Sequence, residues 1–291
     1  MSQVDIAKKL GLSTATVSRL LQKARSAGIV RIEVIDLSSS EDLSAALIDG
    51  LKLRNAAVID TPSSNVLSAL AAPVGSLLQQ AGLRAGSTLG IGWGRAVREV
   101  THAGLPQLPG IATVALNGGM QQAAPHFQIN EFVRQAAEQM GGMPHFLHAP
   151  YISSSELRYA FLTDPTVQQV TSLWNRLDAA IVGVGLTHQI NPSEATAALP
   201  GERALAHAAG DVLRHYVTEA GEILHWDGEE RMIAATPEQL RRVPLCIAVA
   251  ASPAKASGII GAARSGMINT LVTDANTAQA ILDRLSATQK S

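Results

Sequence analysis

Glycines alternate with other residues between positions 90 and 95, where the sequence reads Gly-Ile-Gly-Trp-Gly-Arg. Glycines allow a phosphate to approach backbone N–H groups, and Arg95 adds a cation at the same place. The spacing differs from the Gly-x-Gly-x-x-Gly pattern of dinucleotide-binding loops. The spacing is compatible with a phosphate-binding loop over Gly90–Arg95, with a tight turn of no chemical role as the alternative.

Two further segments place polar residues soon after apolar runs. Asn117 and Gly118 follow the apolar segment 111–116, and Lys255 follows the segment 245–250. The glycine admits a close ligand, and the lysine could neutralise a phosphate or, less readily, form an imine with an aldehyde sugar. A plain turn at Asn117 and a solvated lysine at a helix end remain the alternatives.

Other kinds of chemistry find little support in the sequence. His145 and His148 flank an apolar segment with no cysteine or acidic cluster beside them, so no metal site is expected. Hydrolase, P-loop and Cys-x-x-Cys motifs do not occur, so no catalytic residue and no cofactor is predicted. The single cysteine, Cys246, cannot form an internal disulfide, which favours a cytoplasmic protein. We expect no leader peptide and no membrane contact.

From residue 55 onward, short apolar runs alternate with helical segments. Hydrophobic residues make up 46% of the 291 residues and aromatic residues only 3%, so aliphatic side chains must fill the core. Continuous apolar strands separated by helices are typical of a parallel sheet covered on both faces. The sequence therefore predicts an α/β, Rossmann-like domain over residues 55–291.

The expected strands of this domain are 56–60, 88–92, 111–116, 144–148, 179–185, 245–250 and 270–273. Helices are expected at 65–81 (with a break near Pro73), 95–103, 129–140, 166–177, 202–208, 255–265 and 276–286.

The first 36 residues have the pattern of a small helix-turn-helix head. Apolar spacing predicts a helix over 4–10, which Gly11 ends, and Ser13 is placed to cap a second helix over 14–27. The segment 29–36 alternates as a strand does and could form a β-wing, which would make the head winged-helix-like.

Charge is divided unevenly between the head and the rest of the chain. Residues 1–35 contain six lysines and arginines against two acidic residues, whereas the remainder contains 17 against 22. This division indicates nucleic-acid contact confined to the head. In helix-turn-helix units the second helix enters the major groove, so its hydroxyl and basic side chains are the predicted DNA contacts. They are Ser13, Thr14, Thr16, Ser18, Arg19, Lys23 and Arg25. An amphipathic helical hairpin with a solvated basic face is the alternative.

The stretch VDIAKKLGLSTATVSRLLQKARSAGIVRIEV resembles the N-terminus of the SorC family of sugar-responsive regulators. Further words that resemble the family are GSTLGIGWGRAV, LNGG, LHAPYISSSELR, DAAIVGVG, GDVLRHYVTEAG and GAARSGMINTLVTDANTA, so the resemblance spans almost the whole chain. It implies an effector domain with the fold of sugar-phosphate isomerases and glucosamine-phosphate deaminases. It also implies a phosphorylated-sugar pocket that uses Gly92, Trp93, Gly94 and Arg95 of the glycine-containing loop together with Asp211 and Lys255.

The sequence departs from the family pattern at two places. Members of the family carry another helix before the glutamine matched by Gln3, so the head over 1–36 is expected to lack its first helix, through a misassigned start at Met1 or through truncation. They also have Ala-Gly-Gly before the lysine, where this chain has Ala251, Ser252 and Pro253. Losing glycines there narrows the approach of a phosphate, so the effector could differ from the family's common ones.

Together these features predict a DNA-binding transcriptional regulator with a linker and helix over residues 37–54. Its expected partners are double-stranded operator DNA and a phosphorylated sugar effector. Palindromic operators favour a homodimer or homotetramer. The alternatives are an enzyme of the sugar-phosphate isomerase or deaminase type, and an effector-binding remnant with weak DNA binding.

Overall fold

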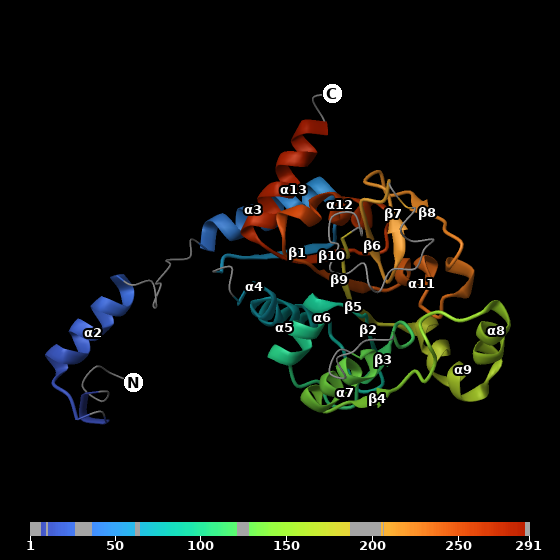
Figure 1. The fold of residues 1–291 in the computed structure, drawn as a ribbon, viewed down its shortest axis with the longest axis horizontal. Coiled ribbons are helices and arrows are strands. Elements are labelled where there is room, and N and C mark those ends of the chain that lie inside the picture. Colours follow the sequence, from blue (N-terminus) through green and yellow to red (C-terminus); the bar gives the residue numbers. More distant parts are fainter. Residues whose placement is uncertain are drawn as a thin grey trace. The chain divides into compact units, whose positions relative to one another are not determined.

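The computed structural model describes residues 7–9, 11–26, 37–61, 65–120, 128–186, 205 and 207–288, except for the side chains of 21–26, 37–39 and 288. The chain divides into two compact units, a head of Met1–Asp36 and a body of Leu37–Ser291 (Figure 1).

The described part of the head contains the predicted pair of helical segments. Residues 7–9 are helical, Gly11 has a left-handed φ of 64°, and α2 spans Thr14–Ser26. Thr16 donates its backbone N–H to Ser13 Oγ over 3.1 Å, which confirms the predicted N-cap. The expected wing at 29–36 and residues 4–6 and 10 of the first helix lie outside the described residues.

The described part of the body is built on a seven-stranded parallel sheet with the order β1-β10-β9-β5-β2-β3-β4. Every residue of β2 and β10 is buried, as expected for strands covered on both faces. The strands are β1 (Asn55–Ile59), β2 (Thr88–Ile91), β3 (Ala112–Ala115), β4 (Met143–His145), β5 (Ala179–Gly183), β9 (Leu245–Val249) and β10 (Thr270–Asp274). All seven strands lie where the sequence predicts strands.

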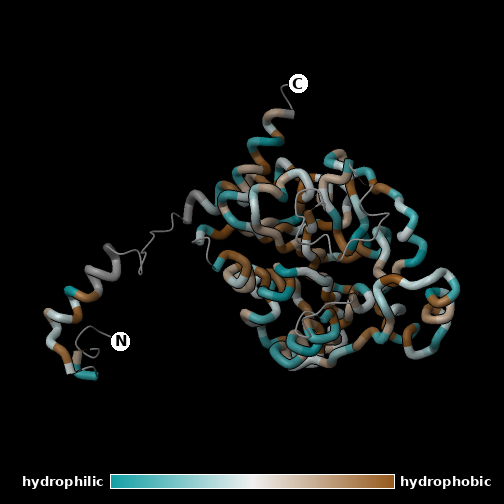
Figure 2. Tube along the Cα trace, viewed as in Figure 1, coloured by the Kyte–Doolittle hydropathy of each residue, from teal (hydrophilic) through white to brown (hydrophobic). Residues whose placement is uncertain are grey.

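Helices cover both faces of the sheet (Figure 1). On one side lie α4 (Val66–Ala69), α5 (Ala71–Gln80), α6 (Arg95–Ala103) and α7 (Ile129–Met140). On the other lie α3 (Leu37–Leu51), α12 (Ala256–Arg264) and α13 (Ala275–Thr288). Hydrophobic residues recur among hydrophilic ones along these helices (Figure 2), as expected when one face of each helix packs on the sheet.

Three further α-helices belong to the described part of the body. They are α8 (Ser155–Thr163), α9 (Pro165–Thr171) and α11 (Pro237–Arg241). A 3₁₀-helix over Ser172–Arg176 follows α9, so the helix predicted over 166–177 changes type after Thr171.

A second, antiparallel sheet lies outside the main one and consists of β6 (Gly210–Val212), β7 (His215–Val217) and β8 (Ile223–Leu224). Val212 pairs directly with His215, so the turn between β6 and β7 contains only Leu213 and Arg214. Nothing in the sequence pattern predicts this sheet, because its strands are too short to show a period.

Some helix boundaries differ from the predictions. The polar residues 37–42, at the start of the predicted linker and helix over 37–54, already belong to α3, and Ser40 among them is buried. The helix predicted over 65–81 is interrupted at Leu70, and Pro73 lies in the first turn of α5, where proline needs no hydrogen-bond partner. Residues 202–204 and 206 of the helix predicted over 202–208 lie outside the described residues, and the described residues 205 and 207–208 are not helical.

Candidate effector site

The strand order reverses direction between β5 and β2. From β2 the chain proceeds through β3 to β4 on one side, whereas from β5 it proceeds through β9 to β10 on the other. In open parallel sheets, ligands bind at the carboxyl ends of the strands at such a switch point. The Gly92–Arg95 loop follows β2 at this point, so the topology favours the same place that the glycines indicate.

The Gly92–Arg95 loop is tied to β5 and leads into α6. Gly92 donates its N–H to the Ile181 carbonyl oxygen over 2.8 Å, and a Cβ on Gly92 would lie 3.0 Å from Leu213 Cδ2. Gly94, the N-cap of α6, has a φ of 148°, a conformation that side chains rarely adopt. The first N–H groups of α6 therefore open at the switch point with Arg95 exposed beside them, an arrangement that suits an anion.

The loop after β3 is held by backbone bonds on two sides. Gly118 donates to the Ile233 carbonyl oxygen over 2.8 Å, and a Cβ on Gly118 would lie 2.3 Å from the Pro150 carbonyl oxygen. Asn117 is buried, and its Nδ2 donates to the Gly118 carbonyl oxygen over 2.9 Å. Among the described residues no donor reaches Asn117 Oδ1. A buried acceptor of this kind can accept a ligand hydroxyl.

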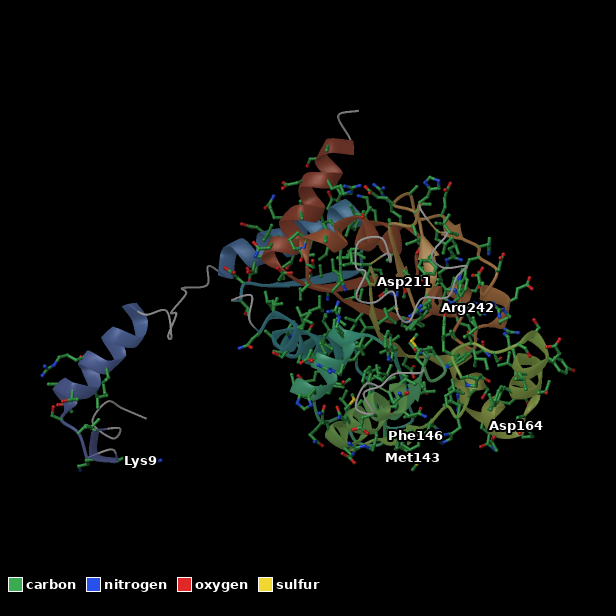
Figure 3. All side chains as sticks on the ribbon, viewed as in Figure 1. Lys9, Met143, Phe146, Asp164, Asp211 and Arg242 are labelled. Atoms are coloured by element: carbon green, nitrogen blue, oxygen red, sulfur yellow. The ribbon has the colours of Figure 1, made fainter. Side chains whose placement is uncertain are left out.

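Residues directly after β5 bring the remaining predicted residues together. Lys255 donates from Nζ to the Val184 carbonyl oxygen over 2.7 Å, and Gly185 donates its N–H to the Asp211 carbonyl oxygen over 2.9 Å. A Cβ on Gly185 would lie only 1.9 Å from Asp211 Oδ1, so the Asp211 carboxylate packs on the Gly185 backbone. Asp211, labelled in Figure 3, lies on β6. Sequence reasoning missed Val184 and Gly185, although Gly185 ends a predicted strand.

The β6–β7 turn lies against the same edge of the sheet. Leu213 and Arg214 have φ values of 50° and 62°, and a two-residue turn with both φ values positive normally contains Asn-Gly. Holding two other residues there costs roughly 1–2 kcal/mol each. The Arg214 N–H donates to Asp211 Oδ2 over 2.8 Å, which closes the turn. Strain of this kind gathers at functional sites.

The Arg214 side chain extends toward the loops after β3 and β4. Its guanidinium carbon lies 5.5 Å from the centre of the Tyr151 ring, and one of its nitrogens lies 3.9 Å from Met120 Sδ. Tyr151 donates its N–H to the Gly119 carbonyl oxygen over 2.7 Å and its hydroxyl to Met232 Sδ over 2.6 Å. Arg214 is 8% exposed, so the turn places a buried cation beside the Asn117–Gly119 loop.

The loop that carries Lys255 is strained as well. Ser252 has a φ of 150°, in a region that favours glycine, at a position where the SorC pattern has Ala-Gly-Gly. Its N–H donates to Thr277 Oγ1 over 2.8 Å, and Thr277 in turn bonds the buried Asp274 carboxylate. The Lys255 N–H donates to the Ser252 carbonyl oxygen over 2.9 Å, so this network fixes the start of the lysine turn.

A carboxylate supports the far side of the β6–β7 hairpin. His215 donates from Nε2 to the Ala235 carbonyl oxygen over 2.9 Å, and its Nδ1 lies 3.5 Å from Glu229 Oε1. His225 Nδ1 lies 2.7 Å from Glu229 Oε2. These contacts, that with His215 first, hold the pKa of Glu229 below its usual range, although partial burial acts in the opposite direction.

The predicted DNA contacts lie on one helix of the head. Ser13, Thr14, Ser18 and Arg19 are exposed and Thr16 is partly buried, whereas Val17 is buried. Ser13 and Thr16 also bond each other through their hydroxyls over 2.8 Å, so both contribute to the helix cap. The backbones of Lys23 and Arg25 lie on α2, but their side chains lie outside the described part of the chain.

Two further features concern the rest of the molecule. Cys246 is buried in β9, and burial raises the pKa of its thiol to about 12. Within the described residues, histidine, cysteine and acidic side chains form no group of three that could hold a metal ion, and no helix has the length and hydropathy needed to cross a membrane.

Comparisons with known proteins agree with this architecture. A family model described as "Putative sugar-binding domain" matches residues 36–283, and one described as "Winged helix-turn-helix DNA-binding" matches residues 1–31. The chain therefore has the two domains of a DNA-binding transcriptional regulator with a sugar-binding domain. It belongs to the SorC family of such regulators.

Individual relatives are similar over nearly their full length. The sorbitol operon regulator of Klebsiella pneumoniae is 28% identical over 97% of this chain and 93% of its own. The deoxyribonucleoside regulator of Bacillus subtilis (strain 168) is 26% identical over 98% and 93%. The crystal structure of the full-length Klebsiella pneumoniae regulator SorC matches with a TM-score of 0.79 and 28% identity, covering 97% of this chain and 94% of that one.

Proposed function

We propose that the body binds a phosphorylated sugar at the carboxyl ends of β5, β2 and β3, and that this binding controls the affinity of the head for operator DNA. The observation that carries the proposal is the convergence of Asp211 and Lys255 on residues Val184 and Gly185, directly after β5. The Gly92–Arg95 loop is bonded to the same strand.

The chemistry of the site supports an anionic carbohydrate. A phosphate needs backbone N–H donors and cations, which the start of α6, Arg95 and Lys255 supply. Sugar hydroxyls need acceptors, and Asp211 and the buried Oδ1 of Asn117 supply these. Two relatives are named for sorbitol and for deoxyribonucleosides, so sorbitol 6-phosphate and deoxyribose 5-phosphate are the first compounds to test.

Control of DNA binding requires that the effector prefer one arrangement of two heads. We propose a homodimer or homotetramer on a palindromic operator, contacted by Ser13, Thr14, Thr16, Ser18, Arg19, Lys23 and Arg25 of each head. A tenfold change in operator affinity needs a preference of about 1.4 kcal/mol for one state. The names of the relatives support a regulatory role in place of an enzymatic one.

Calorimetry on the full-length protein tests the effector class. The probes are sorbitol 6-phosphate, deoxyribose 5-phosphate, glucose 6-phosphate and their non-phosphorylated forms. Only the phosphorylated forms should bind wild type, and Lys255→Ala should abolish this binding. Lys52→Ala, which removes an exposed lysine at the end of α3, is the control. Binding of the non-phosphorylated sugars alone would contradict the proposed effector class.

An operator-binding assay tests the control of DNA binding. Arg19→Ala should weaken binding and reduce the slope of log affinity against log salt by about 0.9, as expected for one lost phosphate contact. The phosphorylated probe that binds in calorimetry should shift the operator affinity of wild type but not that of Lys255→Ala. An effector that binds and leaves operator affinity unchanged would contradict the regulatory role.

A further inference from the structure

The turn between β6 and β7 places a second arginine at the edge of the proposed site. Arg214 is buried, has a left-handed backbone and follows directly after Leu213, whose side chain lies against Gly92. Its N–H bonds Asp211, and its guanidinium reaches Tyr151 and Met120. Arg214 therefore connects the carboxylate on β6 with Tyr151 and the loop after β3, while its neighbour Leu213 packs on the loop after β2.

The backbone of this turn opposes the presence of an arginine. A residue with φ near 60° in a two-residue hairpin is normally glycine or asparagine, because a Cβ crowds the following carbonyl oxygen. A large charged side chain kept at such a strained position indicates a role for its charge.

The neighbours of Arg214 fix the direction of the guanidinium. Tyr151 lies beneath it at 5.5 Å and is itself held by bonds to Gly119 and Met232. A guanidinium can bind two oxygens of a phosphate or carboxylate side by side through its forked N–H groups. One of the Arg214 nitrogens bonds the sulfur of Met120, the residue directly after the Asn117–Gly119 loop.

We propose that Arg214 is a specificity-determining residue that binds an oxyanion group of the effector beside the Asn117–Gly119 loop. The inference rests on the proposed function, since it assigns a further contact to the same site. The lysine on the β9 side, Lys255, and the arginine of the hairpin then lie toward opposite ends of the ligand. The oxyanion is a phosphate or a carboxylate, and both have the paired oxygens that the guanidinium fork requires.

Replacing Arg214 with glycine tests the role of the charge without straining the backbone. Arg214→Gly removes the guanidinium and also relieves the left-handed backbone, so the variant should retain a single cooperative thermal transition. Arg214→Lys keeps a positive charge without the fork. Lys52→Gly is the matched control, because Lys52 is a second left-handed basic residue, with a φ of 56°, but lies exposed at the end of α3.

The experiment is calorimetry on the full-length proteins with sorbitol 6-phosphate, deoxyribose 5-phosphate, glucose 6-phosphate, gluconate, glucuronate and inorganic phosphate. We expect Arg214→Gly to bind the anionic probe that wild type binds at least tenfold more weakly, Arg214→Lys to lie between them, and Lys52→Gly to match wild type. A phosphorylated probe or a sugar acid as the ligand identifies which oxyanion the arginine takes.

The possible failures are distinguishable. Wild-type affinity in both folded Arg214 variants overturns this inference and leaves the proposed function standing. If Arg214→Gly does not fold, wild-type affinity in Arg214→Lys with every anionic probe overturns the fork-specific role. If wild type binds only non-phosphorylated neutral sugars, or none of the probes, both the proposed effector class and the role of Arg214 are overturned.

Discussion

The carboxyl edge of the sheet is divided into two halves of opposite character. At β5, β2 and β3 the strand ends lie near the β6–β7 hairpin. Three basic residues reach this half: Arg95 after β2, Arg214 on the hairpin and Lys255 from the loop after β9. At β1, β10 and β9 the strand ends border an open groove of about 430 Å³. The groove is lined by Thr61, Val66, Ala251, Ser252, Pro253, Asp274, Asn276, Gln279, Ala280 and Asp283. Among the described residues, this lining contains acids and amides and no basic residue.

One loop separates the two halves. Lys255 extends from the β9–α12 loop toward Val184 on the hairpin side, whereas Ser252 of the same loop lines the groove. The comparison shows that the strand ends alone do not select an anion, because both halves have them. The two halves differ in the glycines at positions 92 and 185, which let the hairpin approach the sheet at β2 and β5. The predictions below therefore change one half at a time.

The largest effect is expected from Gly185→Ala. A Cβ at this position would lie 1.9 Å from Asp211 Oδ1, so Asp211 must move and the Arg214 N–H loses its acceptor. We expect at least a tenfold loss of affinity for the phosphorylated probe, or about 1.4 kcal/mol, measured by calorimetry.

Gly183→Ala is the control, because a Cβ there meets its nearest described neighbours at an ordinary 3.8 Å. Equal affinities in the two variants would show that close approach of the hairpin to β5 does not matter for binding.

An effect of comparable size, on stability instead of affinity, is expected on the groove side. Thr277→Val removes the hydroxyl that accepts from the Ser252 N–H and bonds the buried Asp274. Leaving buried polar groups without a partner costs about 1–3 kcal/mol, which should appear as a lower midpoint in urea unfolding.

Thr163→Val, which removes an exposed hydroxyl bonded only within α8, should leave the midpoint nearly unchanged. If Thr277→Val instead unfolds as wild type does, the network contributes nothing to holding the loop.

The sequence predicts most of the body because its strands are buried on both faces. Such strands appear as continuous apolar runs, and the helices over Arg95–Ala103 and Ile129–Met140 have their predicted bounds. Features without a local signal were missed. No side chain of α8 is buried, so it has no apolar stripe, and the β6–β7 turn contains Leu-Arg where a turn signal would be Asn-Gly.

The residues of the candidate site were likewise predicted only in part. Glycines and a lysine after apolar runs indicate loops at strand ends, so Gly92, Gly118 and Lys255 could be singled out from the sequence. Arg214 could not, because its importance depends on a long-range approach to Tyr151 that no spacing encodes. The serine-rich start of α3 was predicted as part of a linker because its polar residues hide a buried position: Ser40 is buried, and its carbonyl oxygen accepts a bond from Ser44 Oγ.

A gain in stability is expected from Ser252→Gly, at the loop shared by both halves. The φ of 150° at Ser252 favours glycine, so glycine should relieve strain at this position. Glycine also makes the unfolded chain more flexible, which offsets part of this gain. We expect the free energy of unfolding to rise by roughly 0.5–1 kcal/mol. Thermal unfolding measures it. Ser68→Gly, within a short helix, should be destabilising by a similar amount. Destabilisation of both variants would mean that Ser252 has a role beyond accommodating the turn.

The smallest effect concerns pH and the far support of the hairpin. The pKa of Glu229 is lowered by His215 and His225, so the folded state favours its charged form more than the unfolded state does. Its contribution to stability is therefore present above the ordinary glutamate pKa of 4.5 and is lost as the pH falls through the lowered value. Melting temperatures should be measured from pH 7 to pH 3. Near neutrality wild type should melt at a higher temperature than Glu229→Gln, and the difference should vanish in acid. Glu230→Gln, at the exposed neighbouring position, should follow wild type throughout. A difference between wild type and Glu229→Gln that stays constant down to pH 3 would show that the hairpin does not depend on this carboxylate's charge.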